Sequence, residues 1–356
     1  MTIISALTWE DHPMGHRPLR CLITVVTLLA ASVTGAAADD VADFYKSKTF
    51  TIVVGHEVGT GFDLYSRVLA RHIGRHIPGH PNVVVQNMVG ASGVTPANWL
   101  YNVAPKDGSV IMTFVHTAAL EPIFGNGAAR FDAAKLTWIG NMDEGVGICG
   151  VSPASGVGKF EDLLTKEVPF GSTGATGPLG KYALAVKNLL GAKIKLVPGY
   201  QGSASVKLAI NRGEVHGICG LSMSSVTSQW RDELQSGTFK IILQLSGTPH
   251  PALTDVPHVE RFAKSADDEQ VFGLIFGAQA LGRIYGSAPG TPAERRNALR
   301  AAFMATMSDP QFLSDATRSQ IDINPSNGAE VEAFIARIAA SSPEVVERAR
   351  RATRAD

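Results

Sequence analysis

The 356-residue chain has few cysteines, few aromatic residues and no net charge. Lysine plus arginine and aspartate plus glutamate both number 32. This balance gives no support to binding of nucleic acids or anionic membranes, because those partners require a clustered basic excess. Only 7% of the residues are aromatic, whereas 45% are hydrophobic and 36 are glycine. Such a composition is typical of an α/β protein with many tight turns, and the length is comfortable for two domains.

Catalytic motifs are also missing. The sequence contains no His-Glu-x-x-His and no Cys-x-x-Cys, and Gly90–Gly93 lacks the spacing of a nucleophile elbow. His72 and His76 lie four residues apart on a predicted helix and could chelate a metal. A solvated polar face is the better interpretation, because no carboxylate or cysteine accompanies them. We therefore predict no enzyme, no metal site and no cofactor.

Long hydrophobic runs are absent except near the N-terminus. Arg17 and Arg20 precede the apolar run Cys21–Ala31, and small residues follow as far as Ala38. This pattern indicates a secretory signal, and the run is too short to span a bilayer. We expect residues 1–38 to be a signal peptide cleaved near Ala38, which makes the mature protein periplasmic. The alternatives are a buried N-terminal helix and, because acidic residues precede the signal, a true start at Met14.

Two of the three cysteines follow the signal. Cys149 and Cys219 both lie within the sequence Gly-Ile-Cys-Gly. In an oxidising compartment such a pair can form a disulfide. Two buried free thiols are also common, so this pattern alone leaves both outcomes open.

Apolar runs alternate with segments of helical period along the chain. The first part predicts strands and helices in the order 49–55, 62–76, 82–86, 92–102 and 109–115. The pattern restarts with strands at 146–151, 168–171, 193–197, 215–219 and 240–245, and helices at 177–190, 203–212 and 222–234. After residues 248–258 we expect helices to the end, at 292–307, 310–319, 329–340 and 343–351. The alternation predicts two α/β units with a ligand cleft between them.

Two glycine-rich loops connect predicted strands to helices. The first runs from Gly55 to Asp63 (GHEVGTGFD), where glycines allow close backbone approach and a helix start presents free N–H groups. It lacks the third glycine of a dinucleotide fingerprint. Asp63 could cap the helix, which is the more ordinary role, or accept a hydrogen bond from a ligand. His56 could donate a hydrogen bond at the mouth of the cleft or be a surface histidine.

The second loop, Phe170–Gly177 (FGSTGATG), brings three hydroxyl groups to a helix start. No lysine follows in the spacing of a P-loop, which disfavours a nucleoside triphosphate. Alone, the loop could be an ordinary N-cap turn. Opposite a similar loop across a cleft, it favours an anion site.

Five motifs in this order resemble the extracytoplasmic solute receptors of tripartite tricarboxylate transporters, the Bug or TctC-type family. They are Phe50–Asp63, Val83–Gly93, Tyr101–Ile111, Phe170–Gly177 and Val197–Gly217. The resemblance extends from Phe44 to about Phe334. It implies a type II periplasmic-binding-protein-like fold of two lobes, each a mostly parallel sheet flanked by helices, with the ligand cleft at the hinge. We expect residues 39–145 with 268–356 to form domain 1 and residues 146–267 to form domain 2.

The resemblance also implies a site that holds a carboxylate through backbone N–H groups and waters rather than through arginine. First-domain contacts would be Val58, Gly59, Thr60, Gly61, Phe62, Asp63, His116, Thr117 and Ala118. Second-domain contacts would be Ser172, Thr173, Gly174, Ala175 and Thr176, with Tyr200 and Gln201 nearby. Val58 and Thr60 replace the Pro and Gly of the commoner motif, which reshapes the pocket. Cys149 and Cys219 would be neighbours on antiparallel strands.

The function implied by the resemblance is capture of a small organic acid and its delivery to the membrane permease subunits of a tripartite tricarboxylate transporter. We expect a monomer that binds no nucleic acid. A ligand sensor feeding a two-component signalling system would use the same cleft and is the main alternative. An enzyme of this shape would need a nucleophile and base, or a metal set, in the cleft, and the sequence offers neither.

Overall fold

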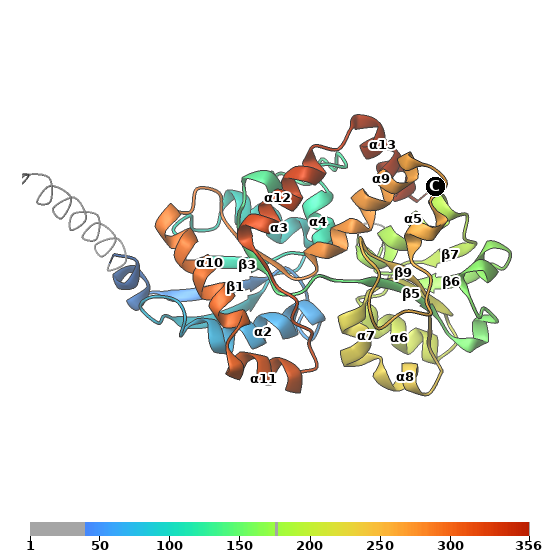
Figure 1. The fold of residues 1–356 in the computed structure, drawn as a ribbon, viewed down its shortest axis with the longest axis horizontal. Helices are drawn as coiled ribbons and strands as arrows, with labels where there is room; N and C mark the ends of the chain where they lie inside the picture. Colours follow the sequence, from blue (N-terminus) through green and yellow to red (C-terminus); the bar gives the residue numbers. More distant parts are fainter. Residues whose placement is uncertain (1–39, 175–176, 356) are drawn as a thin grey trace, which may run out of the picture.

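The structure is a computed structural model that describes residues 40–174 and 177–355. The expected signal peptide, residues 1–38, lies outside the described residues. Two α/β lobes lie side by side, each built on its own sheet (Figure 1). Within the described ranges, no helix is long and apolar enough to cross a membrane.

The first lobe contains a six-stranded sheet in the order β11-β4-β10-β3-β1-β2. Strand β1 (Thr49–Val54) pairs in parallel with β2 (Asn82–Asn87) and with β3 (Val110–Thr113). The other members are β4 (Thr137–Asn141), β10 (Ile284–Ser287) and the edge strand β11 (Ser326–Asn327). Helices α2 (Gly61–Ile73), α10 (Ala293–Met307) and α11 (Pro310–Arg318) share one apolar core with this sheet, and α3 (Val94–Asn102) and α12 (Gly328–Ala339) contribute to another.

The second lobe contains a five-stranded sheet in the order β7-β6-β8-β5-β9. Its strands are β5 (Gly147–Val151), β6 (Val168–Gly171), β7 (Ile194–Val197), β8 (Gly217–Ser222) and β9 (Lys240–Leu245). Helix α5 (Pro178–Leu190) packs into one core, and α6 (Ser203–Asn211) and α7 (Met223–Gln229) pack into the other. Helix α8 (Arg231–Gln235) follows α7 after Trp230, so the expected single helix over residues 222–234 is divided in two.

Two strands carry the chain between the lobes. Strand β5 enters the second sheet after β4 and runs antiparallel to both β8 and β9. Strand β10 returns to the first sheet and runs antiparallel to both β3 and β4. The pairings among β1, β2 and β3 and among β6, β7 and β8 are parallel. The antiparallel pairs are those made by β5 and β10, together with the pairing of the edge strand β11 with β4.

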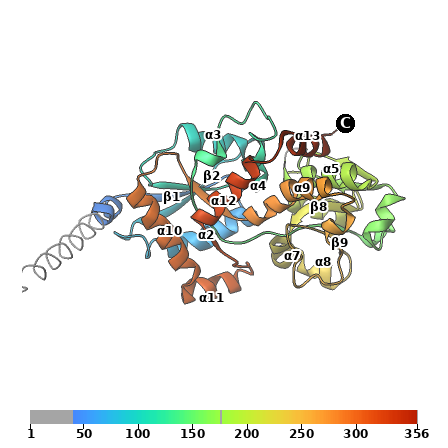
Figure 2. The same cartoon turned by 45° about the horizontal axis from the view of Figure 1, so that its top comes forward.

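The C-terminal part of the chain contributes to both lobes. Helices α9 (Ala266–Ile275) and α13 (Pro343–Ala352) share an apolar core with α5 of the second lobe. The three helices lie together in both views (Figures 1 and 2). Helices α10 and α11 pack on the first lobe instead. The domain limits given above remain an expectation, and this packing divides residues 268–356 between the two lobes.

The prediction that the chain is helical after residue 258 was wrong at β10. This strand has only four residues, and all of them are buried. Its sequence, Ile-Tyr-Gly-Ser, includes a glycine and a serine, so it forms neither a continuous apolar run nor a recognisable period. Its conformation is fixed by pairing with β3 and β4, which are far away in the sequence.

The two cysteines meet at the centre of the second sheet. The antiparallel register of β5 and β8 places Cys149 opposite Cys219, with 4.0 Å between their Cα atoms. The structure joins them by a disulfide, and both residues are fully buried.

Candidate functional site

A cavity of about 90 Å³ lies where the two lobes meet. First-lobe residues line it from the loop before α2 and its first turn, from the start of α4 (His116–Leu120) and from the segment just before β10. Second-lobe residues line it from the loops and first turns of α5 and α6 and from the junction of β8 with α7. The lining residues are His56, Thr60, Gly61, Phe62, His116, Thr173, Pro178, Leu179, Gly202, Ser203, Gly220, Leu221, Ser222, Ser225, Gln279 and Arg283.

Helix starts from both lobes converge on this cavity. Helix α2 begins at Gly61, α5 at Pro178 and α6 at Ser203, and each of these residues lines the cavity. The first helical turn leaves N–H groups without intrahelical partners and carries the positive end of the helix dipole. The cavity is therefore suited to an anion.

The first glycine-rich loop contributes three of the six residues that the resemblance implied. Thr60, Gly61 and Phe62 line the cavity, whereas Val58 is 70% exposed. Gly59 has a left-handed backbone (φ +79°), and its N–H donates to Oδ2 of Asp63 at 3.0 Å. The N–H of Gly59 is therefore used within the loop and is not free to bind a ligand.

The buried Asp63 is held within its own lobe. Besides the N–H of Gly59, Arg67 and Asn87 donate to its carboxylate at 3.0 Å. Burial acts to raise the pKa of Asp63, but the hydrogen bonds from Arg67, Gly59 and Asn87 hold it below its usual value. Asp63 thus shapes the loop as an ionised carboxylate and is not among the residues that line the cavity.

Thr173 of the second loop lines the cavity, whereas Ser172 is fully buried behind it with an unpartnered hydroxyl group. Gly174 is not among the lining residues, and Ala175 and Thr176 lie outside the described residues. In the next loop, the implied residues Tyr200 and Gln201 stand just before Gly202 and Ser203, which do line the cavity.

His116 faces the cavity with both ring nitrogens unpartnered. Its ring stacks on that of Tyr182 in α5 with 5.9 Å between centroids. Burial, aided by the positive charges of Arg283 and Lys181, lowers the pKa of His116 to about 3. The imidazole is therefore neutral near neutral pH and offers one donor and one acceptor. The implied neighbours Thr117 and Ala118 are buried but do not line the cavity.

His56, singled out as a possible donor at the mouth of the cleft, also lines the cavity. Its ring stacks on Phe62 with 5.4 Å between centroids, and its Nδ1 has no partner. Burial lowers the pKa of His56; Glu57 acts in the opposite direction and Arg283 in the same one. The two histidines of the cavity therefore serve as neutral hydrogen-bonding groups.

Arg283 is the lining residue that the sequence least indicated. It stands just before β10 and is only 3% exposed, yet its side chain lines the cavity with a permanent positive charge. Among the described lining residues, none is Asp or Glu. The resemblance implied a site without arginine, so Arg283 is a departure from that expectation. No local motif surrounds it, and only the long-range pairing of β10 brings it to the cleft.

The prediction of a solvated face at His72 and His76 was wrong for His72, which is buried, and both histidines pair with aspartates. His72 Nε2 lies 2.9 Å from Oδ2 of Asp315, and His76 Nε2 lies 2.7 Å from Oδ2 of Asp309. Asp309 is the N-cap residue of α11, and Asp315 lies within that helix. The two pairs therefore hold α11 against α2 and the turn that follows it. No grouping of three metal-ligating side chains occurs among residues 40–174 and 177–355.

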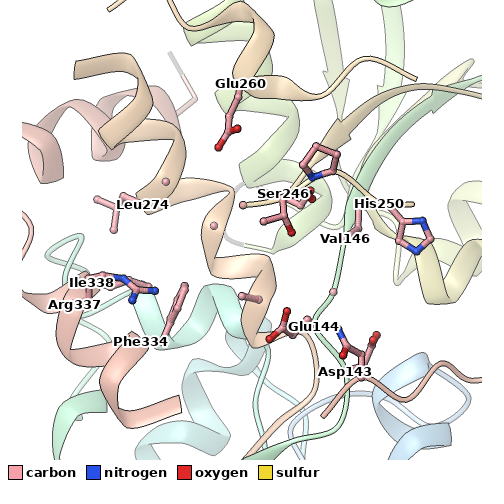
Figure 3. Close-up of a pocket in the computed structure, with 18 of the residues that line it drawn as sticks. Asp143, Glu144, Val146, Ser246, His250, Glu260, Leu274, Phe334, Arg337 and Ile338 are labelled. Carbon is pink, nitrogen blue, oxygen red and sulfur yellow. The ribbon is translucent and has the colours of Figure 1, made fainter. Parts of the chain in front are cut away.

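A larger groove of about 950 Å³ lies elsewhere between the lobes (Figure 3). Asp143, Glu144 and Val146 border it at the segment leading into β5, and Phe334 and Arg337 of α12 lie across from them. Asp322 and Glu260 also line this groove, so its acidic lining outweighs Arg337. None of the predicted loop residues faces it, and its charge is unsuited to an acid.

The two sheets, the crossing strands and the cavity between lobes define a two-lobed solute-binding protein. A family model described as "Tripartite tricarboxylate transporter family receptor" matches residues 66–350. The chain therefore belongs to this TctC receptor family, as the five sequence motifs predicted. Receptors of this family are periplasmic. A search of curated proteins gave no match.

Solved structures confirm the two-lobed fold. The periplasmic binding protein BugD is 18% identical, with a TM-score of 0.66 over 86% of this chain and 98% of that one. MatC from Rhodopseudomonas palustris with bound malate is 16% identical, with a TM-score of 0.64 over 86% and 99%. A second R. palustris protein, Rpa4515 with adipate, is 17% identical, with a TM-score of 0.64 over 85% and 97%.

Proposed function

We propose that the cavity between the lobes captures a small organic acid, which the protein delivers to the membrane subunits of a tripartite tricarboxylate transporter. The convergence of α2, α5 and α6 carries this proposal, since each has at least nine residues and each begins at the cavity lining. A helix start stabilises an anion by about 0.3–1 kcal/mol when exposed and up to about 2 kcal/mol when partly buried. Two structural neighbours, one with adipate and one with bound malate, support the same ligand class.

The size of the cavity limits the ligand. A water molecule requires about 10–15 Å³ of such volume, so 90 Å³ accommodates roughly six to nine atoms of that size. This estimate favours a short-chain acid. We further propose that the protein works as a periplasmic monomer after cleavage near Ala38, and that it binds its acid without transforming it.

The test is a thermal-shift assay on the mature protein with malate, succinate, adipate, glutamate and benzoate. A ligand at 100 times its Kd adds about 2.7 kcal/mol to the free energy of unfolding, which raises Tm by several degrees. Succinamide, which has the shape of succinate without its charge, is the matched control and should leave Tm unchanged. If none of the acids raises Tm above the succinamide control, the proposal is wrong.

A charged variant locates the site. Thr173→Asp places a carboxylate at the cavity lining and should abolish the shift produced by an acid. Thr165→Asp adds the same charge at an exposed position of the second lobe and should preserve it. Ser172 is less suitable, because a charge at that fully buried position would destabilise the fold. Persistence of the shift in the Thr173 variant would place the ligand elsewhere.

A further inference from the structure

Arg283 is a buried cation without an acidic partner among the described residues. Its Nη1 donates to the carbonyl of Gly282 at 2.7 Å, and its Nη2 donates to Oγ of Ser222 at 3.4 Å and of Ser224 at 3.1 Å. Its Nε has no partner. Neutral oxygen acceptors offset only part of the cost of removing a guanidinium from water, and buried charges are normally paired with an opposite charge.

Asp143, a candidate counterion whose pKa the charge of Arg283 affects, does not pair with this guanidinium. Asp143 is buried, and burial raises its pKa to about 6 although Arg283 acts to lower it. Within the described parts of the chain, no ion pair joins the two side chains. The described residues therefore leave the charge of Arg283 without a negative partner, a place that a bound anion would fill.

The guanidinium of Arg283 is held in one place. Its central carbon lies 4.6 Å from the ring centroid of Phe62 and 4.7 Å from that of Tyr65. Gly61 leaves it room, because a Cβ at that position would lie only 2.9 Å from Nη2. A planar cation fixed by two aromatic rings loses little conformational freedom when it binds an anion.

The same cavity contains further buried polar groups without partners. Both ring nitrogens of His116 and Nε2 of Gln279 are unpartnered, and these residues are 5% and 1% exposed. They are neutral, so they suit the uncharged polar atoms of a ligand, whereas Arg283 suits the charged ones. The lining is thus divided between one cation and several neutral hydrogen-bonding groups.

We propose that Arg283 forms a buried ion pair with a carboxylate of the ligand, while His116 and Gln279 bind a hydroxyl or carbonyl group of the same molecule. This inference rests on the proposed function and adds to it a side-chain cation that supplements the helix starts. The ligand class it defines is a small acid that carries a second, uncharged polar group, such as a hydroxy acid.

The test compares Arg283→Gln and Arg283→Met with the wild type by titration calorimetry, using the panel acid that raises the Tm of the wild type most. Removal of one member of a buried charged pair should weaken binding about 30-fold or more. Arg295→Gln is the matched control, because Arg295 also stacks on an aromatic ring, that of Phe44, and donates to a backbone carbonyl, but outside the cavity. It should change affinity less than about twofold.

A second measurement separates binding from folding. Because Arg283 is unpaired without ligand, Arg283→Met should leave the Tm of the ligand-free protein unchanged or higher. Gly61→Ala, which displaces the guanidinium but keeps its charge, should also weaken binding. Wild-type affinity in the Arg283 variants would overturn the ion pair while leaving the proposed function intact. A large loss of ligand-free Tm in Arg283→Met would instead assign Arg283 a structural role.

Discussion

The disulfide between Cys149 and Cys219 should contribute a large part of the stability of the second lobe. The bond spans 70 residues and joins the two central strands β5 and β8. In the chain-entropy description, a cross-link stabilises a protein by restricting its unfolded state, and the effect grows with the logarithm of the loop length. A 70-residue loop corresponds to about 4.4 kcal/mol at 25 °C. This value is comparable with the whole stability of a small domain.

Two perturbations remove the bond in different ways. Cys149→Ala with Cys219→Ala eliminates both the cross-link and the packing of two fully buried sulfur atoms. Refolding the wild type in reductant eliminates the cross-link alone. We expect the reduced wild type to lose about 3–4 kcal/mol, and the double variant to lose slightly more because its core also contains two small voids.

The assay is urea unfolding, monitored by the fluorescence of Trp230. This residue packs in the core of the second lobe. The other tryptophans are replaced by Phe, so that the signal reports on this lobe alone. The midpoint should fall on reduction, and the slope of the free energy against urea should rise because a chain without the cross-link exposes more surface when it unfolds. Equal midpoints for the oxidised and reduced proteins would refute the reasoning. A loss seen in the alanine variant but not on reduction would show that packing, not the cross-link, stabilises the lobe.

Two further predictions concern ion pairs. Lys181 of α5 and Glu121, which follows α4, form a buried ion pair that connects the lobes. Lys181→Met alone should lower the free energy of unfolding by about 3–5 kcal/mol, because it leaves a buried charge unpaired. Adding Glu121→Leu should restore most of this loss, as measured by urea unfolding. Asp315 has its pKa lowered to about 2 by hydrogen bonds from Arg71 and His72. Its contribution to stability is therefore fully present above about pH 4 and is lost as the pH falls through about 2. Asp315→Asn should flatten the dependence of Tm on pH across that window, and an unchanged slope would contradict the assignment.

Local patterns were sufficient to predict the long elements of this fold. The apolar residues of α2 recur at helical spacing over 13 residues, and the helix begins within one residue of its expected start. It ends at Ile73 rather than at residue 76 because the chain then makes tight hydrogen-bonded turns toward Gly79. Strand β1 likewise occupies its expected place. These elements are determined by residues close together in the sequence.

Elements fixed by distant pairing were not predictable in this way. Strands β4 (TWIGN) and β10 (IYGS) are fully buried but include glycine and polar residues, so neither forms the continuous apolar run that revealed the equally buried β3 (VIMT). The two strands pair with each other although about 140 residues separate them. A hydrogen bond from the N–H of Arg283 to Oδ1 of Asn141 supports the same pairing. A strand whose partner is so remote carries little information in its own few residues.

The candidate site divides in the same manner. The family resemblance implied Thr60 and Thr173 as contacts, and local geometry indicated only that glycine-rich loops at helix starts suit an anion. Gly59 and Asp63 stand in the same motif but bond to each other, an outcome set by the left-handed turn at Gly59. Sequence proximity to a loop therefore predicts the region of a site better than it predicts which side chains face the cavity.

Arg283 also links the charge of the cavity to the arrangement of the lobes. Its backbone N–H bonds to Asn141 of β4 in the first sheet, whereas its guanidinium donates to Ser224 at the start of α7 in the second lobe. An anion bound to this guanidinium therefore contacts a side chain that already joins both lobes. A ligand favours one arrangement only through its different affinity for the two, and separation of the lobes would withdraw the starts of α5 and α6 from an anion bound to Arg283. The ion pair proposed for Arg283 consequently provides a physical reason why an acid would stabilise the closed lobes.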